Sequence, residues 1–204
     1  MQSLSNCCGG AAAATYFKHQ RNVNMKCSIS VLLIVFTMAV QAQFKTARLQ
    51  ALGLTCAMCS NSITKSLKTI PFIESVEVDL KNTSYELKFK EGATVDFDVI
   101  RKKVESAGFS VGMLSVVAEF KDVKVKNDAL VLLGGQVFHF VSVKEQVLNG
   151  EQKFQIINKF FVPLKEAKKY TALSKSEQLK TEKAGAEGKN LGVDAGTRVF
   201  NVTI

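Results

Sequence analysis

The sequence predicts an α+β protein in which a β-α-β-β-α-β segment is followed by a smaller β-rich segment. In the first half, two stretches repeat apolar residues with a helical period, and the runs beside them alternate with the period of a strand. In the second half, Gly-Gly and Asn-Gly pairs separate β-rich runs. With 204 residues, 47% hydrophobic and 22% charged, the chain has the composition of one or two globular domains.

The first two elements are a strand over residues 46–52 and a helix that begins after a short loop. Ile63, Leu67 and Ile70 recur at i, i+4 and i+7, which places them on one helical face. Pro71 ends this helix, because proline has no N–H to donate and disfavours the helical conformation in the residue before it.

A β-hairpin is expected next. Val76, Val78 and Leu80 alternate with polar residues, and residues 85–89 alternate in the same way. The polar stretch between them contains Asn82, a residue that favours turns.

A second helix and a last strand complete this segment. Thr94 or Asp96 is the expected N-cap of a helix over residues 97–104, and Gly108 stands where a glycine commonly ends a helix. Residues 111–117 form the last strand. The order β-α-β-β-α-β is that of the ferredoxin-like fold, and we assign it to residues 43–119.

Residues 120–204 are expected to form a separate small β-rich domain, with an open barrel of the oligonucleotide/oligosaccharide-binding (OB) type as the closest architecture. The turn at Asn149-Gly150 predicts a hairpin between two of its strands. The expected elements are strands over residues 129–133, 136–147, 152–162 and 198–204, a helix over 163–179 and a loop over 181–190.

The first 42 residues are interpreted as an upstream extension and a secretory signal peptide. Met25-Lys26 precedes the apolar run 30–40, and Ala42 supplies a small residue for cleavage. The apolar run is shorter than a transmembrane helix requires. We therefore expect an initiator at Met25, cleavage after Ala42, and a periplasmic or extracellular protein; an uncleaved N-terminal tether is the alternative.

The positive charge does not predict a nucleic-acid-binding protein. The chain has a net charge of +9, and residues 120–204 hold 14 of its basic and 9 of its acidic residues. These charges are interspersed, as on a solvated surface, and the phenylalanines of this segment lie in β-rich runs where they are expected to pack in the core. A weak electrostatic contact with the cell envelope or a membrane surface stays open.

The chemistry is expected at Cys56 and Cys59, since they are the two cysteines left after residue 42, together with one histidine, His139. A structural zinc site needs four ligands, which this set does not supply. His139 alternates within a strand and is interpreted as a structural residue. Two thiolates at the start of a helix, where the N–H groups favour thiolate over thiol, suit Cu(I), Hg(II) or Ag(I).

The loop Gly-Leu-Thr-Cys-Ala-Met-Cys at residues 53–59 resembles the metal-binding loop of heavy-metal-associated domains. These domains occur in copper chaperones, in the N-terminal regions of copper-transporting ATPases and in periplasmic mercury-binding proteins, and the resemblance covers about residues 45–118. It implies that Cys56 and Cys59 are the metal ligands and that Phe109 packs near the loop. Leu54, which stands where the family usually has Met, and Thr55 are then loop-supporting residues.

Taken together, the sequence predicts an exported, non-enzymatic carrier that holds Cu(I) and exchanges it with a donor or acceptor protein. Hg(II) is the second choice of ion, and Ag(I) or Zn(II) are further alternatives. Two other functions stay open: an interaction module whose cysteines are structural, and a thiol-redox protein. The sequence does not give the oligomeric state, nor whether the cysteines are reduced, metallated or disulfide-bonded.

Overall fold

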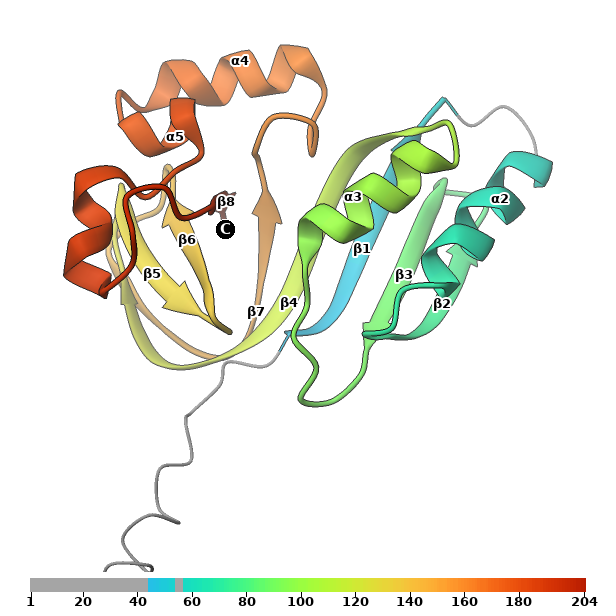
Figure 1. Ribbon diagram of the computed structural model, residues 1–204, viewed down its shortest axis with the longest axis horizontal. Coiled ribbons are helices and arrows are strands. Elements are labelled where there is room, and N and C mark those ends of the chain that lie inside the picture. Colours follow the sequence, from blue (N-terminus) through green and yellow to red (C-terminus); the bar gives the residue numbers. More distant parts are fainter. Residues whose placement is uncertain (1–43, 54–56) are drawn as a thin grey trace, which may run out of the picture. The chain divides into compact units, whose positions relative to one another are not determined.

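The computed structural model describes residues 44–53 and 57–204, which belong to one compact unit (Figure 1). Its eight strands form a single sheet in the order β2-β3-β1-β4-β7-β8-β6-β5. The elements are β1 (Phe44–Leu52), α2 (Ala57–Lys68), β2 (Ile73–Asp79), β3 (Ser84–Phe89), α3 (Phe97–Ser106), β4 (Ser110–Val125), β5 (Ala129–Leu133), β6 (Gln136–Phe140), β7 (Gln146–Ile156), α4 (Leu164–Leu173), α5 (Glu177–Thr181), the 3-10 helix η1 (Gly185–Leu191) and β8 (Val199–Thr203).

The ferredoxin-like arrangement of the first segment is confirmed. Its strands lie in the order β2-β3-β1-β4, all antiparallel, and α2 and α3 cover the same face of the sheet (Figure 1). Ile63 and Leu67 of α2 are fully buried, as their spacing predicts. The Ser66 hydroxyl donates a hydrogen bond to the Lys103 carbonyl oxygen at 2.8 Å, which ties α2 to α3.

The boundaries of α3 follow from its capping residues. Of the two expected N-caps, Asp96 is the one that the structure uses: its carboxylate accepts hydrogen bonds from the N–H groups of Asp98 and Val99. Gly108 follows the helix with a φ of +89°, a conformation that glycine adopts without strain. Between these ends, Phe97, Ile100 and Val104 on one face of α3 are buried.

The alternation in β2 is not what the sequence predicts. Ile73 and Val76 are buried, whereas Val78 and Leu80 are exposed. A register shift in the β2–β3 pairing between Ile73 and Ser75 accounts for the three-residue spacing of Ile73 and Val76. Val76 and Val78 keep the alternating register, since they pair with Leu87 and Tyr85, and Val78 is exposed because it lies near the end of the strand. Because β2 is an edge strand, exposed apolar residues at its end are tolerated.

The turn after β2 is held by Asp79. Its carboxylate accepts hydrogen bonds from the Asn82 side chain at 2.7 Å and from the backbone N–H groups of Lys81 and Asn82. The Asn82 side chain, with these N–H groups, holds the pKa of the Asp79 carboxyl below its usual value. Asn82 is thus a turn residue, as expected.

The second small domain and its OB-like barrel are not confirmed. The expected boundary after Glu119 falls inside β4, a 16-residue strand. Its residues 110–118 pair with β1 and its residues 114–125 pair with β7, so the two pairings overlap. The remaining strands continue the same sheet to β5 at its far edge. One long strand shared by both segments makes the sheet continuous, because a polar stretch does not break a strand whose backbone is paired.

The expected hairpin at Asn149-Gly150 is wrong. Both residues lie within β7, where Gly150 has a φ of +70°. They face an irregularity in β4, and the Asn149 side chain donates a hydrogen bond to the Asp122 carboxylate at 3.0 Å. The pair therefore forms part of a bulge in a continuous β4–β7 ladder, since pairing on both sides outweighs the local turn preference.

The helix expected over residues 163–179 is divided. Helix α4 ends at Leu173, and the short α5 begins after Ser176, whose hydroxyl accepts a hydrogen bond from the Leu179 N–H. Serine competes for backbone hydrogen bonds and so favours such caps over helix interiors. Much of the expected loop over 181–190 belongs to η1, and the terminal strand is confirmed as β8.

A single aromatic core joins the two segments. The Phe97 ring of α3 makes edge contacts with the rings of Phe44 and Phe200 and with Phe138, at centroid distances of 5.2, 5.4 and 6.2 Å. Phenylalanines of the second segment are core residues, as expected, except for Phe160, which is 56% exposed.

In the described part of the chain, no helix is both long and apolar enough to cross a membrane.

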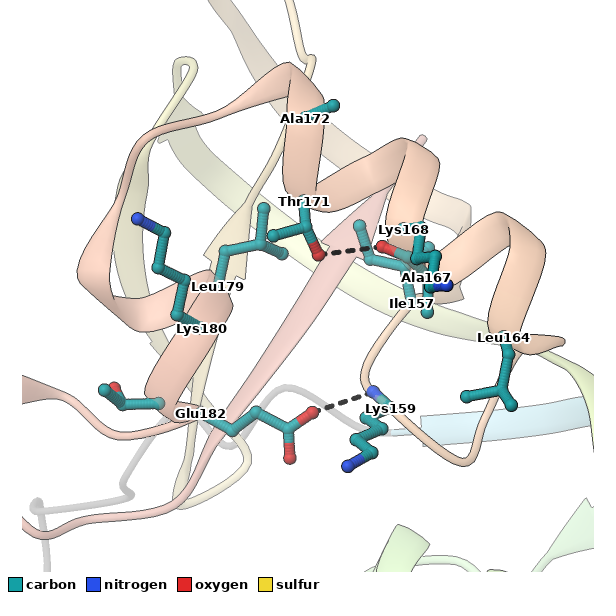
Figure 2. A pocket seen from close by; sticks show the side chains of 11 residues that line it. Ile157, Lys159, Leu164, Ala167, Lys168, Thr171, Ala172, Leu179, Lys180 and Glu182 are labelled. Atoms are coloured by element: carbon teal, nitrogen blue, oxygen red, sulfur yellow. Dashed lines mark hydrogen bonds between the residues drawn. The ribbon is translucent and has the colours of Figure 1, made fainter.

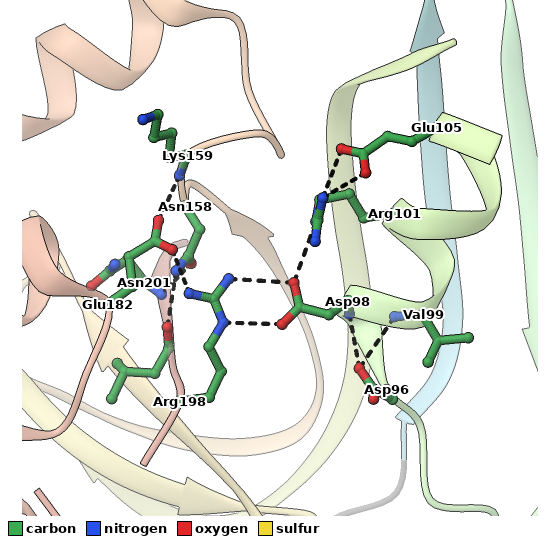
Figure 3. A network of polar contacts seen from close by, with 11 residues as sticks. Asp96, Asp98, Val99, Arg101, Glu105, Asn158, Lys159, Glu182, Arg198 and Asn201 are labelled. Carbon is green, nitrogen blue, oxygen red and sulfur yellow. Dashed lines mark hydrogen bonds and ion pairs between the residues drawn. The ribbon is translucent and has the colours of Figure 1, made fainter. Parts of the chain in front are cut away.

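A polar network reinforces the same contact (Figure 3). The Arg198 guanidinium forms ion pairs with Asp98 of α3 at 3.0 Å and with Glu182. Burial by itself would lower the pKa of Arg198, but the hydrogen bonds and charges of Glu182 and Asp98 raise it overall. Arg198 therefore stays charged and links α3 to the C-terminal part of the chain.

Candidate metal centre

The two ends of the predicted metal-binding loop are defined by the structure. Gly53 follows β1 with a φ of +87°, and Cys59 is the third residue of α2. Cys59 is partly buried. Leu54, Thr55 and Cys56 lie outside the described residues, so their predicted roles stay predictions.

The start of α2 has the electrostatics that a thiolate needs. Its first turn contains no acidic residue, whereas Lys65 and Lys68 lie in its last turn. The first N–H groups of a helix have no partner within the helix and carry partial positive charge. Cys59 sits among them, and this environment lowers the free energy of a thiolate relative to a thiol.

A buried hydrogen bond supports the turn that carries Cys59. The hydroxyls of Ser60 in α2 and Tyr85 in β3 lie 2.9 Å apart, and both side chains are buried. The Ser60 carbonyl oxygen also accepts a hydrogen bond from the Thr64 hydroxyl. The residue directly after Cys59 is thus fixed to the sheet beneath it.

Tyr85 also lies within electrostatic range of Cys59. Burial raises the pKa of the Tyr85 phenol, the hydrogen bond with Ser60 lowers it, and negative charge on Cys59 raises it, with a net increase. At neutral pH the phenol is therefore protonated. It places a neutral polar group below the first turn of α2.

Phe109 packs at the other end of the loop. It is partly buried against the main core. A Cβ added to Gly53 would lie 3.8 Å from its ring, so the ring borders the backbone where the loop leaves β1. The role of Phe109 in supporting the rest of the loop stays a prediction.

His139 does not belong to this site. It lies in β6, which β4, β7 and β8 separate from β1 in the sheet. It is fully buried; its Nδ1 lies 2.8 Å from Asn201 Oδ1, and its Nε2 lies 3.3 Å from oxygens of Ser176 and Asp128. These contacts bear out its interpretation as a structural residue.

The donor set of the described residues favours a soft ion. Residues 44–53 and 57–204 contain no group of three or more His, Cys, Asp or Glu side chains arranged to hold a metal. Cys56 and Cys59 stay the ligands that the sequence predicts. Thiolate donors of low coordination number select Cu(I) and similar soft ions over ions that prefer oxygen.

The Ser60–Tyr85 pair is the feature of this site that the sequence did not reveal. In the sequence, Tyr85 occupies one of the alternating apolar positions of a predicted strand, and nothing marks its hydroxyl as a partner of Ser60. A buried tyrosine requires a partner for its hydroxyl, which is a usable signal. The partner lies 25 residues away, and only the packing of α2 on β3 identifies it.

Comparison with known families identifies this region. The family model of the heavy-metal-associated domain matches residues 48–110. The match begins within β1, includes α2, β2, β3 and α3, and ends at the first residue of β4. This region is therefore similar to heavy-metal-associated domains.

Curated relatives match the same part of the chain. A probable copper-transporting ATPase of Arabidopsis thaliana, HMA5, is 34% identical over 65 residues, which are 32% of this chain and 6% of the ATPase. A copper-transporting ATPase of Helicobacter pylori is 40% identical over 58 residues, which are 28% of this chain and 8% of the ATPase. The chain thus matches less than a tenth of the length of these relatives.

Solved structures align with about a third of this chain. A structure described as the CopZ metallochaperone is 21% identical and is covered to 97%, with a TM-score of 0.30 over 32% of this chain. A solution structure of a copper-bound variant of CopA from Bacillus subtilis is 28% identical and is covered to 90%, with a TM-score of 0.30 over 34% of this chain.

Proposed function

We propose that this protein is a carrier of Cu(I) that holds the ion between the thiolates of Cys56 and Cys59. The observation that carries the proposal is the Cys-x-x-Cys sequence at residues 56–59, within the region that matches the heavy-metal-associated domain. Its second cysteine, Cys59, lies in the first turn of α2. The curated relatives over this region are named for copper transport, which favours Cu(I) over Hg(II), Ag(I) or Zn(II). Their match is confined to this domain, so we assign binding and transfer, not ATP hydrolysis.

Transfer is proposed to proceed by ligand exchange with a partner protein. A thiolate of the partner adds to the two-coordinate ion, and the bond from one of the two cysteines then breaks. The copper stays Cu(I) throughout, and the departing cysteine keeps the electron pair as a thiolate or takes up a proton. The helix N-terminus stabilises that thiolate, which lowers the cost of release.

The test is an anaerobic competition of reduced protein against a Cu(I) chelator. Residues 43–204 are suitable because they include the whole described unit and retain only the two cysteines of interest. We expect one tightly held equivalent, which the Cys56→Ser/Cys59→Ser variant loses.

A displaced-thiol variant controls for the number of cysteines. Cys59→Ser/Ser62→Cys keeps two thiols but moves one of them by about a turn along α2, to an exposed position. It should lose tight binding although its folding, measured by circular dichroism, is unchanged. Equal retention of copper by all three proteins would refute a two-thiolate site. If the wild-type protein retained Hg(II) but not Cu(I), the proposed ion would be Hg(II) instead.

The same proteins separate the remaining functions. Turnover of a disulfide substrate by the reduced protein would favour a thiol-redox protein. Full activity of the double serine variant in a partner-binding assay would favour an interaction module with structural cysteines. The carrier proposal predicts neither result.

We further propose that the protein is exported. The basis is the sequence pattern at Met25–Ala42 alone. Expression of the full chain in a secreting host, followed by N-terminal sequencing, should give Gln43 as the first residue. A chain that keeps its apolar segment and sediments with membranes would instead show a tethered protein.

A further inference from the structure

Helix α4 covers a pocket and is only partly packed against the rest of the protein. None of its described side chains is fully buried, and Leu164 is 68% exposed. Its N-cap residue, Pro163, makes no side-chain capping bond. A ten-residue helix is marginal in water and depends on tertiary packing for its stability. Ala167 and Tyr170 of α4 pack against a small buried cluster, whereas Leu164 stays exposed. The apolar face of α4 is therefore only partly covered, and a ligand can supply further packing.

The pocket lies between α4, α5 and the segment after β7, and its volume is about 760 Å³ (Figure 2). This volume is within the range of small-molecule sites. Ile157 and Leu179 form its buried apolar floor, and Ala167 of α4 lies against them. The floor belongs to a small hydrophobic cluster that is separate from the main core.

The charged residues that line the pocket are three lysines and one glutamate: Lys159, Lys168, Lys180 and Glu182. The glutamate is already engaged. Its Oε1 accepts the Lys159 backbone N–H at 2.7 Å, and its Oε2 pairs with Arg198. Lysine side chains therefore outnumber acidic side chains in the lining of the pocket.

An exposed aromatic residue adjoins the pocket. Phe160 directly follows Lys159 and has a φ of +74°, a conformation that is costly for a residue with a bulky side chain. The Lys159 Nζ lies 5.0 Å from the centre of its ring, and the Arg101 guanidinium carbon lies 5.8 Å from it.

We propose that this pocket binds a single-chain amphiphilic anion, an acyl chain with a carboxylate head. The chain lies on Ile157 and Leu179 and supplies the packing that α4 lacks. The head group pairs with the lysines at the rim. Neither part alone accounts for the site, because an apolar ligand leaves the lysines unmatched and a small anion leaves the floor unfilled.

The test is calorimetric titration with saturated fatty acids of eight to fourteen carbons below their critical micelle concentrations. The full chain and residues 43–204 are titrated in parallel. Affinity should rise up to about fourfold per added methylene, the factor that corresponds to burial of one CH₂. Dodecyltrimethylammonium, which has the same chain length as dodecanoate and the opposite charge, should bind at least tenfold more weakly than dodecanoate.

Two variants of α4 form a matched pair. Lys168→Glu should weaken dodecanoate binding at least fivefold, whereas Lys165→Glu, exposed and not in the pocket lining, should change it less than twofold. Hydrogen exchange should show α4 gaining protection with dodecanoate. Absence of saturable binding, equal binding of the cationic amphiphile, or equal effects of the two variants would overturn the proposal.

A parallel experiment with lipid vesicles distinguishes a free fatty acid from a membrane lipid as the source of the acyl chain. Binding of monomeric dodecanoate as above supports the pocket whether or not phosphatidylglycerol vesicles also bind. Binding to these vesicles without binding of monomeric dodecanoate would show a membrane-surface contact instead, and would overturn the pocket assignment.

Discussion

The hydrogen bond between Ser60 and Tyr85 should stabilise the turn that carries Cys59, and a double-mutant cycle measures its contribution. Tyr85→Phe removes only the phenol oxygen, and Ser60→Ala removes only the hydroxyl at the other end of the 2.9 Å contact. The side chain of Tyr85 is fully buried and Ser60 is 7% exposed. Each single change therefore deprives a buried polar group of a partner.

The magnitude follows from this burial. Leaving a buried hydroxyl without its partner costs about 1–3 kcal/mol, whereas removing both hydroxyls is less costly than the sum. The expected coupling free energy is about 1 kcal/mol. For a unit of this size, each kcal/mol lowers the melting temperature by about 2–4 °C.

Urea unfolding of the four proteins, followed by circular dichroism, supplies the free energies of unfolding. Tyr170→Phe is the matched control, because Tyr170 is partly buried and its hydroxyl makes no hydrogen bond found in the described part of the chain. It should change the free energy of unfolding by less than about 0.5 kcal/mol. Additive effects of Ser60→Ala and Tyr85→Phe would refute the reasoning, since additivity means that the two hydroxyls do not interact.

Four further results are expected. Phe97→Ala should lower the free energy of unfolding by about 3–5 kcal/mol, the range for a buried phenylalanine. Hydrogen exchange should show lost protection from β1 to β8. A loss confined to the strands beside α3 would mean two independent units. Arg198→Met should lower the free energy of unfolding in urea by about 1–2 kcal/mol. This loss is smaller than that from breaking a fully buried ion pair, because 36% of the Arg198 side chain is exposed. If the ion pair is the cause, the double change with Asp98→Asn should be less than additive. The pKa of Asp79 is lowered in the folded protein, so its contribution to stability is present above its unfolded pKa and is lost as the pH falls through the folded pKa. Asp79→Asn should therefore flatten the acid side of a plot of unfolding free energy against pH. An unchanged plot would contradict this. Gly150→Ala should cost about 1–2 kcal/mol in thermal melts because its φ is +70°, whereas no loss would show that the bulge rearranges.

Local sequence patterns correctly predicted much of the ferredoxin-like half of the fold. The helical spacing of Ile63 and Leu67 identified the buried face of α2, and Asp96 was one of two expected caps of α3. These predictions succeed because their cause is local: a helix repeats every 3.6 residues, and a cap needs a side-chain oxygen within three residues of the N–H groups. The candidate ligands Cys56 and Cys59 are equally local, since they are three residues apart.

Local patterns failed where long-range pairing decided the outcome. Asn149-Gly150 has the composition of a hairpin turn, but β4 pairs with β7 on both sides of it and makes it part of a bulge. The polar stretch after Glu119 has the composition of a linker, but it continues β4. In both places, backbone hydrogen bonds to a distant strand outweigh a preference of a few residues.

The sequence by itself determined the β-α-β-β-α-β order and supplied the Cys-x-x-Cys pair on which the proposed copper binding rests. The tertiary structure alone decided that residues 120–204 extend the same sheet, that Tyr85 supports the turn after Cys59, and that α4 covers a pocket lined by lysines. The physical reason is separation along the chain. Turns, caps and periodic faces depend on neighbours within a few residues, whereas sheet continuity, buried hydrogen-bond partners and pockets depend on groups that only the fold brings together.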